Sequence, residues 1–159
     1  MTGAAARRAL PAAELRPSAE LRLPAQIAEE LLRHARGDLP NEACGLLAGD
    51  AGRGQVLAYH PARNEHASPF RFSLDAGDLV RITYAIEAAG QDLLAIFHSH
   101  PNGEPRPSTT DLREARYPMA MHLLAGLRSD LPADGRAASM LRAWQIADGT
   151  PVEVDLRID

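Results

Sequence analysis

The sequence predicts an α/β fold, a three-layer sandwich in which helices flank a mixed β-sheet. Apolar residues recur at helical spacing in two segments, 25–36 and 76–89. Short apolar stretches bounded by Gly and Pro, clearest at 93–97, are typical of buried strands. A chain of 159 residues suits one domain. We expect this domain at 20–159, after a mobile N-terminal tail at 1–19 that is rich in Ala, Arg and Pro.

The first half of the predicted domain combines one helix with four strands. Pro24 opens the helix over 25–36 and Gly37 ends it. A Gly-rich turn at 50–54 separates two apolar stretches, which predicts a pair of strands around the turn. The strands expected in this half lie at 21–23, 46–48, 55–60 and 70–74.

The second half begins with the helix over 76–89. The apolar strand that contains 93–97 follows Gly90. A third helix starts at Ser108 and extends to about 116, before Pro118. The remaining strands are expected at 121–124, 140–146 and 152–158. We find no internal repeat and no second domain.

The most informative motif follows the apolar strand. Residues two apart on a strand point to the same side, so His98 and His100 project together. Prolines and a glycine in 101–107 prevent a regular element and allow Asp111 to return towards the pair. Two imidazoles and one carboxylate are a typical set of zinc ligands that leaves a position for water, as in catalytic sites.

Ser108 and Asp111 have a second interpretation. A serine followed by an acidic residue three positions later is also a capping signal at the start of a helix. The two interpretations are compatible, because a cap would fix the position of the carboxylate.

These residues resemble the JAMM or MPN-type zinc metalloproteases. The family pattern is an upstream glutamate, then His-X-His-Pro, and a Ser-X-X-Asp whose aspartate follows the second histidine after ten intervening residues. This chain matches it at His98, His100, Ser108 and Asp111. Glu42 occupies the position of the family's catalytic glutamate.

The resemblance extends over about residues 20–159. The segment 40–47 is similar to the stretch around the catalytic glutamate in small bacterial members. Weaker similarity occurs at 64–75 and at 141–149. The chain departs from the family pattern at 123–128, where the family usually has a strand ending in Ser-Leu. The resemblance implies the same three-layer, cytidine-deaminase-like α/β fold.

The resemblance also implies a mechanism. One zinc ion per chain, held by His98, His100 and Asp111, would activate water. Glu42 would act as general base, although most glutamates are simply solvated side chains. Ser108 would donate a hydrogen bond to the oxyanion, or would serve only as a helix cap.

The implied substrate is an amide or isopeptide bond after the C-terminal glycine of a ubiquitin-like or sulfur-carrier protein with a Gly-Gly terminus. The short segment 42–98 leaves little room for insertions, which resembles members that release cysteine from such a carrier. The alternatives are a deconjugating isopeptidase, a small-peptide hydrolase and a non-catalytic MPN-type scaffold. The sequence does not indicate the carrier, and a monomer and a homodimer remain equally open.

Composition restricts the partners and the compartment. The formal net charge is −4 without a run of basic residues, which argues against nucleic acid and so against a DNA-repair-associated relative. The chain has no lysine, which excludes Schiff-base chemistry. The single cysteine excludes an intramolecular disulfide, and neither a signal peptide nor a membrane span is evident. We expect a cytoplasmic protein.

Four residues outside the motif allow simple interpretations. Cys44 is expected to be a small buried residue rather than a nucleophile. His34 is expected to face solvent, and Trp144 to lie in the core. Arg106 lies in the loop between the proposed ligands, where it is either an ordinary surface residue or a contact for an acidic group.

Overall fold

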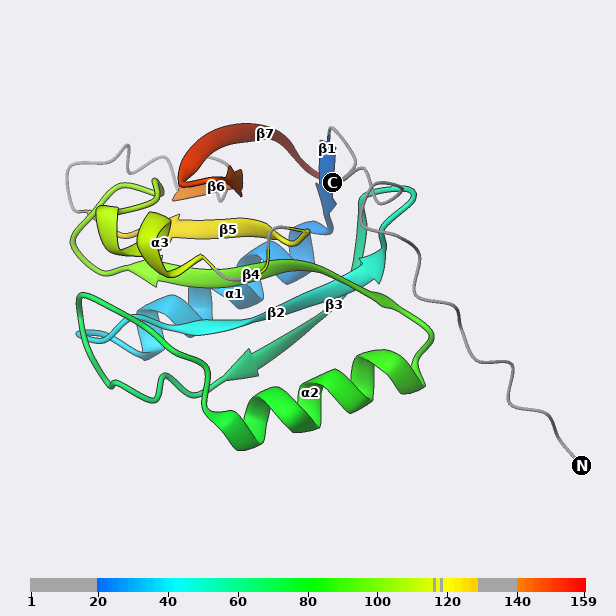
Figure 1. The fold of residues 1–159 in the computed structure, drawn as a ribbon, viewed down its shortest axis with the longest axis horizontal. Coiled ribbons are helices and arrows are strands. Elements are labelled where there is room, and N and C mark those ends of the chain that lie inside the picture. The colour runs from blue at the N-terminus through cyan, green and yellow to red at the C-terminus, as the bar shows by residue number, and fades with distance from the viewer. Residues whose placement is uncertain (1–19, 116, 118, 129–139) are drawn as a thin grey trace, which may run out of the picture.

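The computed structural model describes residues 20–115, 117, 119–128 and 140–159. These residues form one mixed sheet with helices on both faces, as the sequence predicts (Figure 1). The expected tail at 1–19 lies outside the described residues. The elements are β1 (Glu20–Leu23), α1 (Ala25–Gly37), β2 (Cys44–Asp50), β3 (Gln55–Ala62), α2 (Ala76–Ala88), β4 (Asp92–His100), α3 (Thr109–Glu114), β5 (Met121–Gly126), β6 (Leu141–Ala147) and β7 (Thr150–Ile158).

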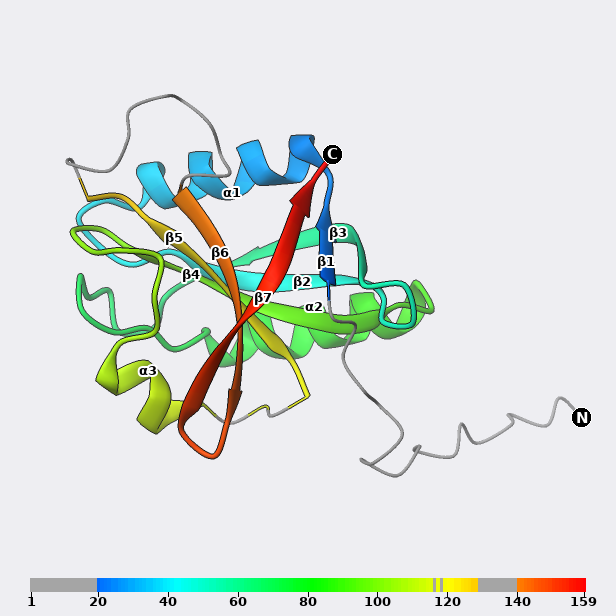
Figure 2. The ribbon, with the colours of Figure 1, turned by 90° about the horizontal axis from the view of Figure 1, so that it is seen from above.

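The strand order is β1-β3-β2-β4-β5-β6-β7, with the metal-motif strand β4 in the middle. β4 pairs antiparallel with β2 and parallel with β5. The sheet closes because β1 also pairs in parallel with β7, beside which it lies in Figure 2. On its other side β1 meets β3 at the single pair Arg22↔Gln55. The sequence did not predict this closure.

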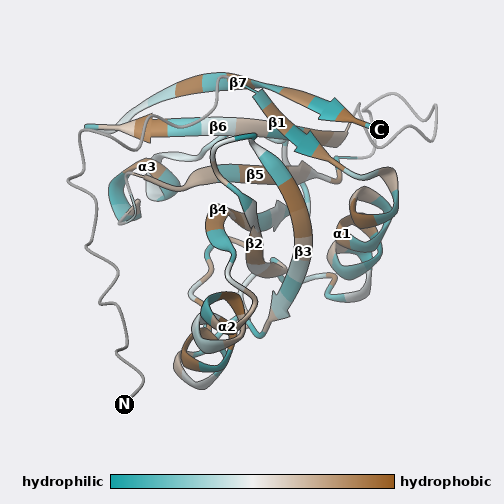
Figure 3. Ribbon diagram, turned by 90° about the vertical axis from the view of Figure 1, so that its right-hand side faces the viewer, coloured by the Kyte–Doolittle hydropathy of each residue, from teal (hydrophilic) through white to brown (hydrophobic). Residues whose placement is uncertain are grey.

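The two faces of the sheet have different coverings. Seen end-on, the sheet curves around an interior that α1 covers, while α2 and α3 lie outside (Figure 3). Alternation along β4 divides its side chains: Phe97 joins the interior core, and Ile96 joins the smaller core under α2. His98 and His100 follow Ile96 at two-residue spacing, so they belong to the outer face.

The expected strand at 70–74 is wrong. In this segment, only Leu74 forms an isolated bridge, to Asn64. The Asn64 side chain replaces a neighbouring strand: its Oδ1 accepts from the Ser73 N–H at 3.1 Å, and its Nδ2 donates to the Arg71 carbonyl at 3.1 Å. Backbone groups satisfied by a side chain need no ladder, so the segment stays irregular.

The other predicted elements exist, with ends that differ by a few residues. The unusual sequence at 123–128 does not disturb β5, whose residues Met121–Gly126 pair in continuous register with Ala95–His100. The third helix is shorter than expected and ends at Glu114. None of the helices in the described part of the chain has the length and hydropathy that crossing a membrane requires.

Candidate metal centre

The two histidines of the motif lie at the end of β4, on the outer face of the sheet. His98 is fully buried and sits between Cys44 of β2 and Leu124 of β5 in the strand register. The Phe72 ring stacks on the His98 ring with centroids 4.3 Å apart. His100, at the last position of β4, has a side chain that is 12% exposed. The pair is therefore held by a central strand, and of the two rings His100 is the one that solvent reaches.

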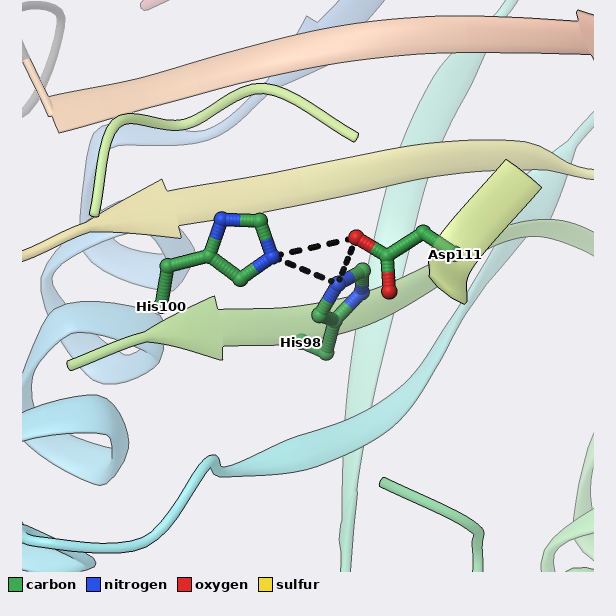
Figure 4. Close-up of side chains that lie close together, drawn as sticks. All are labelled: His98, His100 and Asp111. Carbon is green, nitrogen blue, oxygen red and sulfur yellow. Dashed lines mark hydrogen bonds and ion pairs between the residues drawn. The ribbon is translucent and has the colours of Figure 1, made fainter. Parts of the chain in front are cut away.

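Asp111 reaches the histidines from the first turn of α3. Ser108 is the N-cap: its hydroxyl accepts from the Asp111 N–H at 3.1 Å, and its own N–H donates to Asp111 Oδ2 at 2.8 Å. This reciprocal pair is a capping box. The cap fixes the carboxylate beside the imidazoles (Figure 4). The capping interpretation is therefore confirmed, and it is compatible with the ligand interpretation.

The donor atoms of His98, His100 and Asp111 converge. The two Nε2 atoms are 3.2 Å apart, and Asp111 Oδ2 is 3.1 Å from each of them. Zinc bonds to imidazole and carboxylate are about 2.0–2.2 Å long, so tetrahedral donors lie roughly 3.3–3.6 Å apart. The observed spacing is close to that value. The triad fits a divalent cation.

The protonation states of the triad bear directly on metal binding. His100 Nδ1 lies 2.8 Å from the Glu104 carbonyl, which can only accept, so Nδ1 carries a proton and Nε2 is the nitrogen left for a metal. Burial acts to lower the pKa of His100, but the hydrogen bonds with Asp111 and the Glu104 carbonyl outweigh it and raise the pKa, so a cation at Nε2 would replace a proton there. Burial lowers the pKa of His98 and favours the neutral ring. Burial acts to raise the pKa of Asp111, but the proximity of His98, the hydrogen bonds with both imidazoles and the Ser108 N–H outweigh it and lower the pKa. A neutral imidazole and an ionised carboxylate are the forms that bind metal.

The loop between His100 and Ser108 is anchored to β5 and β6. Trp144, buried as expected, donates from Nε1 to the Pro105 carbonyl at 2.8 Å. A Cβ on Gly126 would lie 2.5 Å from Pro105, so only glycine allows this approach. The Arg106 guanidinium lies 5.8 Å from the centre of the Trp144 ring, within the range of a cation–π contact. These contacts hold the carbonyl that orients His100.

Glu42 lies next to this centre, two residues before β2. Its N–H donates to the Ser68 carbonyl at 2.9 Å, and its carbonyl accepts from Asn64 Nδ2 at 3.1 Å. The side chain is buried, and Oε2 has no hydrogen-bond partner among the described residues. Burial raises the Glu42 pKa to about 8, and the charge of His100 acts against the rise. A carboxylate with a pKa near neutrality can exchange protons at neutral pH.

Two of the residues that hold the site were not expected from the sequence. Ser99 accepts from the Ala43 N–H at 2.8 Å through its hydroxyl and donates from its own N–H to the Ala43 carbonyl. It therefore fixes the residue after Glu42. Ser99 lies between the two histidines in sequence but faces the opposite side of β4, where it is fully buried. Asn64 was noted only for its similarity to the family, not for the contacts it makes.

The structure resolves two other expectations. Cys44 is buried, and burial raises its pKa to about 12, which disfavours a thiolate nucleophile. The expectation that His34 faces solvent is wrong, because its side chain is 19% exposed. Its Nδ1 lies 2.6 Å from the Tyr59 hydroxyl and its Nε2 3.2 Å from Asp38. The hydrogen bond to a core tyrosine draws this ring under the surface.

Comparisons with known proteins agree with the motif. Residues 24–147 match the family described as prokaryotic homologs of the JAB domain. The chain is 42% identical over 112 residues to a desampylase of Haloferax volcanii, covering 67% of this chain and 81% of that protein. It is 33% identical over 134 residues to the CysO-cysteine peptidase of Mycobacterium tuberculosis, covering 84% and 88%.

A solved structure has the same fold. The solution structure of a protein from Desulfitobacterium hafniense superposes with a TM-score of 0.75 at 31% identity, covering 87% of this chain and 92% of that one. The expected fold and the expected enzyme class, a peptidase of the JAMM type, are confirmed. The chain belongs to the family of prokaryotic homologs of the JAB domain, the small prokaryotic type of the JAMM/MPN domain.

Proposed function

We propose that the protein is a zinc-dependent peptidase that hydrolyses the amide or isopeptide bond after the C-terminal glycine of a ubiquitin-like or sulfur-carrier protein. The convergence of two imidazole nitrogens and one carboxylate oxygen, each 3.1–3.2 Å from the others, carries the proposal. Two nitrogens and one oxygen at tetrahedral spacing suit zinc, whereas magnesium and calcium prefer oxygen ligands alone. We assign one ion per chain.

Glu42 is the proposed proton carrier. When bound, zinc would supply Lewis acidity that lowers the pKa of water and polarises the scissile carbonyl. The water oxygen forms a bond to the carbonyl carbon, and Glu42 accepts the proton that the water loses. Glu42 then returns this proton to the amide nitrogen as the C–N bond breaks, giving a carboxylic acid and an amine. Its pKa of about 8 suits both halves of this exchange.

Ser108 is the proposed oxyanion donor. Its oxygen already accepts the Asp111 N–H, so its own hydroxyl proton is free to point into the site. Removal of one such donor costs roughly 100-fold to 1,000-fold in turnover, whereas loss of a cap costs about 1 kcal/mol of stability. We expect Ser108→Ala to show both losses. If only stability falls, the residue is a cap alone.

The substrate class rests on the relatives. The desampylase and the CysO-cysteine peptidase act on conjugates of ubiquitin-like or sulfur-carrier proteins. The first suggests a protein as leaving group and the second suggests cysteine. We further propose a Gly-Gly terminus on the carrier, as the resemblance to the family implies. We place the enzyme in the cytoplasm, as a monomer or homodimer.

The metal assignment is tested first. Plasma mass spectrometry of the purified protein should find about one equivalent of zinc, and a His98→Ala, His100→Ala double variant with retained fold should have none. Circular dichroism checks the fold. A wild-type protein that takes up no metal after incubation with zinc would refute the proposed hydrolase.

A further inference from the structure

A cavity of about 620 Å³ lies directly beside the metal-binding triad, on the outer face of the sheet. His98 and Asp111 of the triad are among the residues that line it. Its floor and the wall on α2 are mainly apolar, and consist of Leu46, Ile96, Leu79, Thr83 and Ile86. A volume in the range of about 300–1,000 Å³ with an apolar lining and few polar groups is typical of a ligand site.

His122 gives the floor of this cavity one polar group. It lies on β5 beside Ile96, on the same face of the sheet as His98. The ring is 5% exposed, and its Nε2 has no hydrogen-bond partner among the described residues. A buried nitrogen without a partner costs free energy, and a bound polar group would remove that cost. The family motif does not include this residue.

The rim of the cavity carries opposite charges. Arg71, from the irregular segment before α2, and Glu114, at the end of α3, both line the cavity. Their side chains form an ion pair with an N···O distance of 2.9 Å, and both are exposed. A substrate that extends out of the cavity would therefore pass the Arg71–Glu114 ion pair, which can hydrogen-bond to peptide groups.

The chemistry of the proposed substrate decides which of its parts can enter. The acyl side ends in two glycines, which have no side chains and cannot fill an apolar space next to the scissile bond. On the other side of the scissile bond, the leaving amine carries a carbon chain that begins at the scissile nitrogen. Cysteine is short, so most of the 620 Å³ would remain filled with water. A long carbon chain would displace that water from apolar walls.

We propose that this cavity is the leaving-group subsite, and that it selects amines with a long apolar carbon chain, such as the four-carbon stem of a lysine side chain, over cysteine. The inference rests on the proposed function. Thr83, Ile86 and Leu79 contact the carbon chain. His122 hydrogen-bonds a polar group of the leaving amine. Residues of α2 and β5 therefore determine the specificity for a carrier joined to a lysine side chain over a carrier joined to cysteine.

Two matched substrates test the selectivity. Both carry the same acyl peptide ending in Gly-Gly, joined either to the ε-amine of Nα-acetyl-lysine amide or to the α-amine of cysteine. Zinc-loaded wild type should cleave the lysine substrate with the higher kcat/KM. Thr83→Trp fills the cavity from an exposed helix position. It should lower kcat/KM for the lysine substrate at least about tenfold and change kcat/KM for the cysteine substrate less than twofold.

The control is Val80→Trp, which adds the same bulk on the exposed side of α2, 56% exposed and outside the cavity. Val80→Trp should leave kcat/KM for both substrates unchanged. Equal losses for the two substrates with Thr83→Trp, or no loss for either, would overturn the subsite. Thermal melts check that the variants fold, and Thr83→Leu offers a smaller filler.

Direct binding separates failure of the subsite from failure of the proposed function. If wild type cleaves neither substrate, the proposed function fails. Nα-acetyl-lysine amide is then titrated into the zinc-loaded protein and followed by NMR. Selective shifts at Thr83 and His122, absent with cysteine amide and lost in Thr83→Trp, would support the subsite on its own. Equal shifts with both amines, or none, would overturn it.

Discussion

The interior face of the sheet and its outer face are built from the same strands but treat polar groups differently. All seven strands of the described chain contribute apolar side chains to the interior core under α1. This core also contains Tyr59 of β3, whose hydroxyl forms a hydrogen bond with His34. On the outer face, buried side-chain atoms of Glu42, His98 and His122 have no hydrogen-bond partner within the described part of the chain. The interior core therefore stabilises the fold, whereas the buried polar groups of the outer face lower its stability and form a reactive site.

Glu42→Gln should produce the largest change, in turnover. Gln cannot accept or return a proton, so we expect kcat to fall roughly 100-fold to 10,000-fold. Steady-state hydrolysis of a Gly-Gly amide by zinc-loaded protein measures it. Retained zinc content is the control, because Glu42 lies outside the ligand triad. Unchanged turnover would remove Glu42 from the mechanism.

The same variant should gain stability when metal is absent. Burial raises the pKa of Glu42 to about 8 in the fold, against an ordinary value of 4.5. Between these pH values the unfolded chain has lost the proton that the native state retains, so stability falls as pH rises, by at most about 1.4 kcal/mol per unit. Gln does not titrate. Urea unfolding from pH 5 to 8 should show that the free energy of unfolding of wild type falls increasingly below that of Glu42→Gln as pH rises. A constant difference between the two proteins over this pH range would contradict the proposed effect of burial.

A pair of core truncations compares the packing of the two faces. Leu31 of α1 is fully buried in the interior core, and Leu31→Ala should cost about 2–5 kcal/mol. Ile86 of α2 borders the cavity, so some of its contacts are already missing, and Ile86→Ala should cost less. Urea unfolding at one pH measures both. An equal or larger cost at Ile86 would mean that the outer face is packed as tightly as the interior.

The predictability of the two faces also differs. Hydrophobic periodicity predicted α1, α2 and the apolar strand β4, because these elements bury a regular stripe of side chains. The two-residue spacing of the histidines and the cap at Ser108 predicted the triad, since both are local signals. Local pattern was therefore sufficient wherever one element alone determines the direction of a side chain.

Features that depend on distant segments were not predictable. Closure through β1 depends on pairing with β7, more than a hundred residues away along the chain. The segment 70–74 has strand-like residues, but the Asn64 side chain satisfies its backbone groups. Ser99 was missed because alternation assigns it to the face away from the histidines, and only the tertiary contact with Ala43 gives it a role.

Ser99→Ala should have a smaller effect than the core truncation, but on both properties. The Ala43 N–H loses its buried acceptor, which costs about 1–3 kcal/mol. Because Ala43 follows Glu42, a shift of this backbone should also lower kcat, by up to about 100-fold. Urea unfolding and turnover of the zinc-loaded variant measure the two losses. A stability loss with full turnover would show that Asn64 and the Ser68 carbonyl alone position Glu42.

Tyr59→Phe should have the smallest effect and isolates the interior face. The ring keeps its edge-to-face contact with Phe97, at 5.7 Å between centroids, and only the hydroxyl is lost. His34 is partly exposed, so water can replace the lost hydrogen bond, and the cost should be about 1 kcal/mol. Turnover should be unchanged, because the interior face touches no reacting group. If turnover falls together with stability, the interior core and the metal centre are coupled through the sheet, and the separation of the two faces is wrong.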